Sequence, residues 1–250
     1  MKEKNEFSIV FEDEQIVVVN KPAGLLTIPD RYNLSLPSLD SILRQKYGEI
    51  FIVHRLDRET SGIMVFAKDA ESHRHLSLQF QNHFVSKIYD AVVKGIVQKD
   101  EIDIDIPIVA HPSKKGLSMP SARGKESRTI LKVKERFKDS TWTECNLITG
   151  RHHQLRVHVA AIGHPLLVDF MYGGGTEFLL SSIKKKKFNL KKHTEEKPIM
   201  NRISMHAKSL VFAHPKTEEK ISFEVPHPKD FAAMLNVLHK YSALKTFISY

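Results

Sequence analysis

Apolar and polar residues alternate along much of this chain with the period of two that is typical of half-buried strands. Strands are predicted over residues 7–11, 16–20, 51–53, 62–68, 87–95, 127–137, 141–148, 209–213 and 221–225. Helical spacing of apolar residues predicts helices over 37–47, 70–83, 151–162 and 228–244. Asp69 is a candidate N-cap, and Gly163 a candidate stop. Many strands with irregularly placed helices indicate an α+β fold, with a mixed, largely antiparallel sheet and flanking helices.

No internal repeat or long low-complexity linker divides the sequence, so a single domain over residues 1–250 is expected. The main irregularity is a basic loop insertion predicted over residues 173–202. It combines a run of three glycines at 173–175 with lysine clusters at 184–187 and 191–192. A lysine run is typical of a solvated loop, but it also suits a surface that grips phosphates, and both interpretations stay open.

The composition is that of an ordinary globular protein with a basic excess. Hydrophobic residues make up 41%, and the formal net charge is +9. An excess of lysine and arginine attracts polyanions such as nucleic acids. The single cysteine, Cys145, excludes an internal disulfide and suits a buried strand residue. No apolar run is long enough to cross a bilayer, and no signal-type stretch follows the charged N-terminus, so we expect a cytoplasmic protein.

One polar cluster interrupts two apolar runs near the first quarter of the chain. It reads His-Arg-Leu-Asp-Arg-Glu-Thr-Ser-Gly over residues 54–62 and places Asp57 between Arg55 and Arg58, ahead of a predicted Thr-Ser-Gly turn. A loop held between two strands can fix a carboxylate rigidly at a surface, which suits a catalytic acid, base or nucleophile. The alternative is a structural arginine–aspartate pair in a hairpin.

This cluster resembles the signature of the RluA family of RNA pseudouridine synthases. Further stretches resemble motifs of that family in the same order. They are Asn-Lys-Pro-Ala-Gly-Leu at 20–25, Lys-Ile-Tyr-Asp-Ala-Val-Val-Lys-Gly at 87–95, Gly-Arg-His-His-Gln-Leu-Arg-Val-His at 150–158 running on to Gly-His-Pro at 163–165, Met-His-Ala at 205–207 and Phe-Ala-His-Pro at 212–215. The resemblance extends from about residue 12 to about residue 228, which is nearly the whole chain.

The resemblance implies the pseudouridine synthase fold, with a central catalytic cleft, and the isomerisation of uridine to pseudouridine in structured RNA. The reaction needs no cofactor, and the sequence contains neither of the common glycine-rich phosphate-binding motifs. The implied partner is ribosomal or transfer RNA, with neither metal nor membrane, and a monomer is the default expectation. Because the motifs begin almost at once, no accessory RNA-binding domain is expected ahead of them.

The resemblance also implies roles for individual residues. Asp57 is the catalytic carboxylate, Tyr89 lies under the uracil ring, and Arg156 is the buried partner of Asp57. An arginine partner would keep the carboxyl ionised in a pocket that excludes water. Arg55 would help fill the space that a flipped-out uridine leaves. Further RNA contacts are predicted at Lys21, Arg58, Arg151, His153, Lys184, Lys185, Lys186 and Lys187.

Each of these residues also has an ordinary structural explanation. Tyr89 suits a strand in the core, Arg156 a helix surface, and Arg55 an ion pair with Asp57. The motif around Lys21 is expected to shape the cleft without taking a chemical step. Whether Asp57 attacks the sugar or removes a sugar proton stays open at this point.

Two other functions compete with the isomerase. The first is a metal-dependent nuclease or phosphatase that uses Asp169 and the histidines at 152, 153, 158 and 164. Their spacing does not match the two histidines, four residues apart with an intervening glutamate, of a zinc hydrolase helix, so no metal is predicted. The second is a non-catalytic RNA-binding protein, which the presence of every expected motif residue disfavours.

Overall fold

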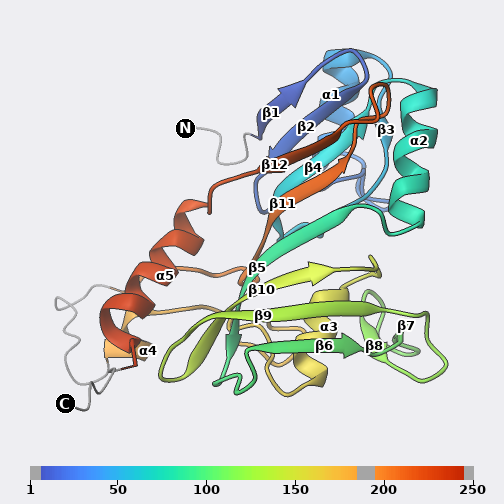
Figure 1. The fold of residues 1–250 in the computed structure, drawn as a ribbon. Coiled ribbons are helices and arrows are strands. Elements are labelled where there is room, and N and C mark those ends of the chain that lie inside the picture. Colours follow the sequence, from blue (N-terminus) through green and yellow to red (C-terminus); the bar gives the residue numbers. More distant parts are fainter. Residues whose placement is uncertain (1–6, 185–194, 245–250) are drawn as a thin grey trace. The chain divides into compact units, whose positions relative to one another are not determined.

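The computed structural model describes residues 7–184 and 195–244, which group into two compact units (Figure 1). The first unit comprises residues 7–89 and 206–227. The second comprises residues 90–184, 195–205 and 228–244. Strand β5, Ser86–Lys94, begins in the first unit and ends in the second. The predicted single domain over residues 1–250 stays a prediction.

The first unit is built on a mixed sheet in which β1, β2, β4, β11 and β5 lie side by side in that order. Strand β3 pairs with β4, and β12 pairs with β11. The β4–β11 pair is parallel, whereas the pairs β1–β2, β2–β4, β3–β4 and β11–β12 are antiparallel. The bounds are β1 Ser8–Glu12, β2 Ile16–Lys21, β3 Phe51–Ile52, β4 Ser61–Ala67, β11 Met205–Ala213 and β12 Lys220–Glu224.

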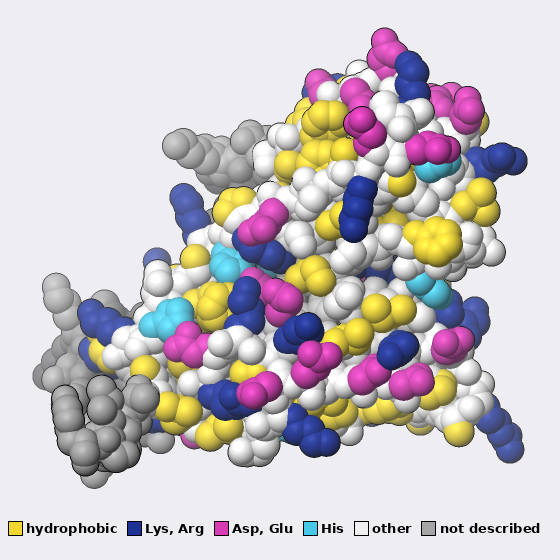
Figure 2. Space-filling view, viewed as in Figure 1, with side chains coloured by type: hydrophobic (Ala, Val, Ile, Leu, Met, Phe, Trp, Pro, Cys, Tyr) yellow, Lys and Arg dark blue, Asp and Glu magenta, His cyan; other side chains and the backbone are white. Residues whose placement is uncertain are grey.

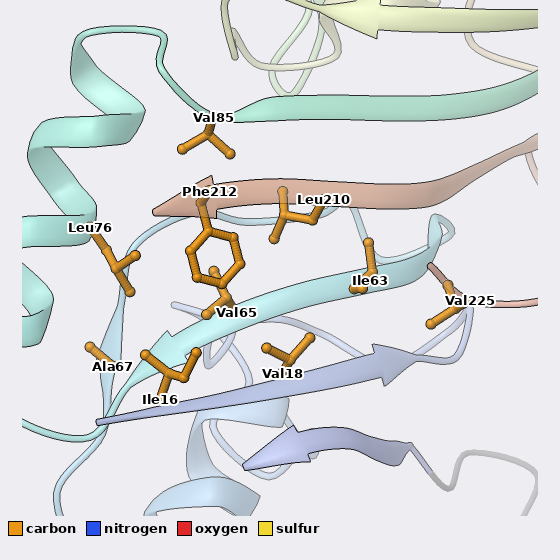
Figure 3. Packing of buried hydrophobic residues seen from close by; sticks show 10 residues of the cluster. All are labelled: Ile16, Val18, Ile63, Val65, Ala67, Leu76, Val85, Leu210, Phe212 and Val225. Atoms are coloured by element: carbon orange, nitrogen blue, oxygen red, sulfur yellow. The ribbon is translucent and has the colours of Figure 1, made fainter. Parts of the chain in front are cut away.

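Two helices complete the first unit, α1 at Leu39–Tyr47 and α2 at Ala70–Gln81. The predicted N-cap of α2 is confirmed, because the Asp69 carboxylate accepts the Ser72 N–H at 2.7 Å. Side chains of α2 pack on alternate residues of β2 and β4 in the core drawn in Figure 3. The intervening residues of both strands are equally buried, so β2 and β4 are covered on both faces.

Close backbone packing between β4 and β11 requires glycine at position 62. Gly62 has a φ of +130°, and a Cβ added there would lie 2.2 Å from the carbonyl oxygen of Ala207. Ser61 and Gly62 therefore belong to the strand, where the sequence predicted a turn. The actual turn lies at Arg58 and Glu59, and the Thr60 N–H closes it on the Asp57 carbonyl at 3.0 Å.

The second unit continues from β5 through β10, β9 and β6, with a separate β7–β8 hairpin. Strand β9 pairs antiparallel with both β10 and β6. Among the described residues of this unit, three helices accompany the sheet, and the core gathers side chains of α5 with Val92, Phe178 and Met200. The bounds are β6 Glu101–Asp105, β7 Ile108–Ala110, β8 Ser118–Pro120, β9 Arg128–Arg136, β10 Ser140–Leu147, α3 Gln154–Ala161, α4 Leu180–Lys184 and α5 Lys229–Ser242.

The predicted α+β class with a mixed, largely antiparallel sheet and flanking helices is confirmed. Helix α3 starts at Gln154, three residues later than predicted, because His153 takes a left-handed conformation with a φ of 56°. The segment predicted as a loop over 173–202 contains α4, and its Phe178 N–H donates to the Met200 carbonyl at 2.7 Å. Cys145 is buried, as expected. Among the described residues, no helix has the length and apolarity needed to span a membrane.

Candidate active site

The loop that carries Asp57 is held to the segment after β2 by a buried lysine. Lys21, at the end of β2, is completely buried, and its ammonium donates to the carbonyls of Leu25 at 2.8 Å, Pro22 at 3.0 Å and Arg58 at 3.2 Å. The Gly24 N–H donates to the same Arg58 carbonyl at 2.8 Å. The residue after Asp57 is therefore fixed through its backbone.

The residue before Asp57 is fixed in the same way. The hydroxyl of buried Thr27 donates to the Leu56 carbonyl at 2.8 Å and accepts the Leu56 N–H at 3.3 Å. We call these contacts of Lys21, Gly24 and Thr27 to residues 56 and 58 the Asp57 clamp. A carboxylate whose two chain neighbours are both tied down is positioned before any substrate arrives.

The surroundings of Lys21 do not fit the RNA contact that the sequence predicted for it. An RNA contact needs an exposed ammonium, and this one has no exposed surface and is hydrogen-bonded to protein carbonyls. Burying a charge is costly unless hydrogen bonds replace its hydration, and the three carbonyls do so here. We therefore assign Lys21 to positioning of the Asp57 loop. Its place two residues after the apolar run of residues 16–19, at the end of the same strand, was a sequence signal for burial.

His54, as a neutral imidazole, fixes the start of the same loop. Its Nε2 accepts the Val65 N–H of β4 at 3.1 Å, and the imidazole stacks on Phe80 of α2 with centroids 4.7 Å apart. Desolvation, together with the positive charge of Lys87, lowers the pKa of His54 to about 3. His54 therefore stays uncharged at neutral pH, and its role is structural.

Tyr89 and Asp57 are brought together within the first unit. Tyr89 is buried on β5, and burial followed by the negative charge of Asp57 raises the pKa of its hydroxyl above the ordinary value. The phenol therefore stays protonated over the physiological pH range. In this form it can donate a hydrogen bond, whereas it cannot serve as a base.

The two arginines beside Asp57 are both exposed, but their surroundings differ. The Arg58 Nε donates to the Gly24 carbonyl at 3.2 Å, and its guanidinium lies 3.8 Å from the Glu59 carboxylate. Arg55 projects from the loop as an exposed side chain. This position suits the predicted role of Arg55 toward a flipped nucleotide, which stays a prediction.

The start of α3 carries the predicted residues of the second unit. The Gln154 side chain accepts the Arg151 N–H at 3.0 Å, and exposed Arg151 donates through its Nε to the Glu126 carbonyl at 3.0 Å. The left-handed backbone of His153 is uncommon for a residue other than glycine, and such conformations often mark functional positions. RNA contacts by Arg151 and His153 stay predictions.

Arg156 is buried on α3 and forms a planar ion pair with Asp169. Its Nε and Nη2 donate to the two carboxylate oxygens at 2.7 and 2.8 Å. Sequence reasoning considered Asp169 only as a metal ligand and missed this pairing. A lone carboxylate after the apolar residues 165–168 was the available signal, since a buried charge needs a partner. The predicted pairing of Arg156 with Asp57 joins residues of different units and stays a prediction.

The clustered histidines form hydrogen bonds within the second unit. His152 Nδ1 lies 3.0 Å from the Ser118 hydroxyl, and His153 Nδ1 lies 2.8 Å from the Tyr172 hydroxyl. Both ring nitrogens of His158 are engaged, by Thr129 and by the Ile106 carbonyl, and His164 contacts the Lys94 carbonyl. These contacts tie α3 and the turn after it to the neighbouring strands.

Of the predicted lysine cluster, only Lys184 falls within the described residues. It ends α4, and its ammonium lies 5.0 Å from the centre of the Tyr241 ring. Lys185, Lys186 and Lys187 lie outside the described residues. Elsewhere, basic and acidic side chains are interspersed over the face shown in Figure 2. On β9, for example, Arg128 and Lys132 pair with carboxylates of β6.

Comparison with known proteins places the chain in a family. The sequence pattern of the RNA pseudouridylate synthases matches residues 15–161. The chain belongs to this family. It is 38% identical over 224 residues to the dual-specificity RNA pseudouridine synthase RluA of Vibrio parahaemolyticus, a match that covers 87% of this chain and 82% of that protein. The resemblance to the RluA family drawn from the sequence is therefore confirmed.

The chain is also similar to other RNA pseudouridylate synthases. The chain is 37% identical over 247 residues to ribosomal large subunit pseudouridine synthase D of Neisseria meningitidis, which covers 96% of this chain but only 63% of that protein. Two solved structures share the fold, human RNA pseudouridylate synthase domain containing 1 and domain containing 4. Their TM-scores are 0.68 and 0.70 at 25% identity, over 98% and 93% of this chain and 91% and 93% of theirs.

Proposed function

We propose that this protein converts uridine to pseudouridine in structured RNA and that Asp57 is its catalytic carboxylate. The observation that carries the proposal is the Asp57 clamp. In a chain that belongs to the RNA pseudouridylate synthases, one carboxylate lies on a loop tied down on both sides, beside a buried tyrosine. Positioning of this kind is expected where a group must meet a single reacting atom.

The reaction detaches uracil from ribose at the ring nitrogen, turns the base, rejoins it through carbon 5 and removes the proton there. A single carboxylate suffices for the sugar step, as a nucleophile at the sugar carbon or as a base that takes a sugar proton. We assign this step to Asp57 and leave the choice between the two routes open. No oxidant or group donor is consumed, because substrate and product are isomers.

Tyr89 and Arg55 would act on the base during this step. The buried ring of Tyr89 offers a stacking surface for a uracil that has left its own stack, and its protonated hydroxyl can donate a hydrogen bond. Exposed Arg55 is the candidate to occupy the space that the flipped nucleotide leaves. Arg58, Arg151, His153 and the lysines at 184–187 are proposed to contact the phosphate backbone.

The proposed substrates are ribosomal and transfer RNA, and the proposed location is the cytoplasm. Two of the relatives are named a dual-specificity RNA enzyme and a ribosomal large subunit enzyme. The surface charge is consistent with an RNA partner, since the net charge is +9. A monomer that needs no metal remains our working prediction.

Release of tritium from RNA labelled at uracil carbon 5 tests the proposal directly. Unmodified ribosomal and transfer RNA pools would be incubated separately with the wild type, with Asp57→Asn and with Asp100→Asn. The last variant removes an exposed carboxylate that pairs with Arg136. We expect release by the wild type and Asp100→Asn, and none by Asp57→Asn.

Three outcomes would contradict the proposal in whole or in part. RNA binding without release by the wild type would favour the non-catalytic RNA-binding alternative. Strand cleavage that stops on addition of a chelator would favour the metal-dependent nuclease. Release by Asp57→Asn at the wild-type rate would retain the isomerase but move the catalytic role away from Asp57.

A further inference from the structure

The turn over residues 169–175 holds the guanidinium of Arg156. Asp169, which is fully buried, accepts both parallel hydrogen bonds from Arg156, and it also accepts the Met171 N–H at 3.1 Å. Two parallel bonds fix the plane of the guanidinium as well as its position. The third bond fixes the carboxylate relative to its own backbone. Arg156 is therefore bound by a carboxylate that is itself fixed in position.

The backbone of this turn is closed on Asp169. The Gly174 N–H donates to the Asp169 carbonyl at 2.8 Å, and the Asp169 N–H donates to the Gly175 carbonyl at 2.9 Å. A Cβ at Gly174 would lie 2.3 Å from the Asp169 nitrogen, so the approach requires glycine there. The turn is thus a compact support for one buried carboxylate.

Tyr172, from the same turn, covers Arg156 and carries two further contacts. Its ring centre lies 4.8 Å from the Arg156 Cζ, within cation–π range. Its hydroxyl accepts the Ser118 N–H at 2.9 Å and forms a second hydrogen bond with the Nδ1 of His153 at 2.8 Å. One side chain therefore connects Arg156, the start of α3 and strand β8.

Strand β8 belongs to a hairpin with the charge expected of an RNA-contacting element. It packs against α3, and the segments flanking it carry the exposed cations Lys114, Lys115, Arg123 and Lys125. Such cations contact phosphates without reading bases. Through Ser118, the hairpin is tied to the same hydroxyl that lies beside Arg156.

We infer that Tyr172 and Asp169 are positioning residues for Arg156, and that the Tyr172 hydroxyl links the orientation of that guanidinium to the β7–β8 hairpin. The inference rests on the proposed function and on the prediction that Arg156 is the buried partner of Asp57. Asp169 fixes the plane of the guanidinium, and Tyr172 covers its face. Neither residue is assigned a chemical step.

Single-turnover tritium release with the full chain tests the role of the hydroxyl. Tyr172→Phe retains the ring over Arg156 and removes only the oxygen. We expect its rate constant to fall about 3- to 10-fold, as for loss of a neutral hydrogen bond, with RNA affinity unchanged. Tyr241→Phe, which removes another hydroxyl from the same unit, is the matched control and is expected to retain the wild-type rate. Thermal unfolding of each variant checks folding.

Repeating the measurement in the Arg156→Lys variant separates positioning of Arg156 from a general structural effect. If Tyr172 acts through Arg156, Tyr172→Phe will cause no further loss of rate when Arg156→Lys is already present. Asp169→Asn, which retains the shape of the carboxylate, is expected to be non-additive in the same way. A full additional loss in the Arg156→Lys background, or a wild-type rate for Tyr172→Phe alone, would overturn the inference.

A spectroscopic measurement keeps the inference testable apart from turnover. In nitrogen-15 NMR spectra, the Arg156 Nε–H should exchange slowly with water, since it is buried against Asp169 and Tyr172. Tyr172→Leu removes the covering ring, and we expect exchange to be at least about 10-fold faster. Unchanged exchange would contradict the positioning role. If the wild type releases no tritium at all, the proposed function fails first, and the link to catalysis fails with it.

Discussion

The two units hold their candidate site residues by different means. In the first unit, residues on both sides of Asp57 are tied through backbone carbonyls and N–H groups to Lys21, Gly24 and Thr27. In the second unit, Arg156 is tied through its own side chain to a buried carboxylate and a covering ring. One unit fixes a piece of backbone, and the other fixes a guanidinium.

This difference determines what each region is sensitive to. The Asp57 clamp holds backbone groups, so it fails when the backbone path, the Lys21 ammonium or the Thr27 hydroxyl changes. A side-chain ion pair tolerates small backbone shifts but responds to any change of charge or shape in its partner. Rigidity at Asp57 is therefore a property of the fold, whereas rigidity at Arg156 depends on two residues.

The largest expected effect comes from Gly62→Ala, which attacks the backbone path of the first unit. A Cβ would lie 2.2 Å from the Ala207 carbonyl oxygen in a conformation that other residues rarely adopt. We expect a loss of about 4 kcal/mol or more in the free energy of unfolding, measured by urea denaturation.

Gly163→Ala in the second unit is the matched control for Gly62→Ala. Gly163 has a positive φ of +84°, but a Cβ there would meet nothing within 4 Å. Only the backbone conformation opposes it, so the expected loss is about 1–2 kcal/mol. Equal losses at both positions would mean that the β4–β11 approach is not the source of the effect.

Lys21→Met comes next in size and tests the clamp itself. Methionine retains the apolar stem of the side chain but leaves the carbonyls of Pro22, Leu25 and Arg58 without their shared donor. We expect a loss of about 3 kcal/mol in stability and at least about a tenfold lower rate of tritium release from the folded protein. Lys132→Met, at an exposed ion pair with Glu101, should cost less than about 1 kcal/mol.

Tyr89→Phe tests the contribution of a single hydroxyl group in the first unit. Because burial and Asp57 raise its pKa, the hydroxyl is present as a hydrogen-bond donor and phenylalanine removes it while retaining the ring. We expect kcat to fall about 10- to 100-fold with KM little changed. Equal kcat values for the two proteins would limit Tyr89 to stacking.

The most gradual expected effect is a pH dependence from His54. Its pKa is about 3 in the folded protein against 6.5 ordinarily, so the unfolded chain takes up the proton first as pH falls. The stability contributed by the neutral ring is complete above about pH 6.5 and is lost toward pH 3, at about 1.4 kcal/mol per pH unit.

His54→Gln separates the contribution of His54 to the pH dependence of stability from the titration of other groups. An amide oxygen can still accept the Val65 N–H, but it does not titrate. The stability difference between wild type and variant should therefore narrow as urea unfolding is repeated from pH 7 to pH 5. A difference that stays constant over this range would show that His54 does not titrate with a depressed pKa.

The sequence predicted those elements whose boundaries depend on local chemistry. Asp69 caps α2 as expected, and the strands that became β2, β5, β9 and β10 lie within about one residue of their predicted bounds. The short strands β6, β7 and β8 were missed. Strands β7 and β8 have three residues each, which is too short to show a period, and the alternation of Glu-Ile-Asp-Ile-Asp in β6 was overlooked.

The sequence named candidate site residues, whose roles stay predictions, but it did not predict their supporting contacts. Motif resemblance singled out Asp57, Tyr89 and Arg156, because a short sequence pattern preserves residue type. It did not reveal that Asp169 holds Arg156 or that Lys21 is buried, since both depend on turns whose closure is set by tertiary packing. Likewise, the left-handed backbone at His153 shortened α3 against its apolar periodicity.

The parallel contact between β4 and β11 has a consequence for biosynthesis. Ser61 bonds to His206, 145 positions further along the chain. At about 5–20 residues per second, a ribosome needs roughly 7–30 seconds to supply that partner strand. Throughout this interval the edge of β4 at Ser61 and Gly62 stays unpaired. We expect the nascent chain to be a chaperone client until its last strands emerge.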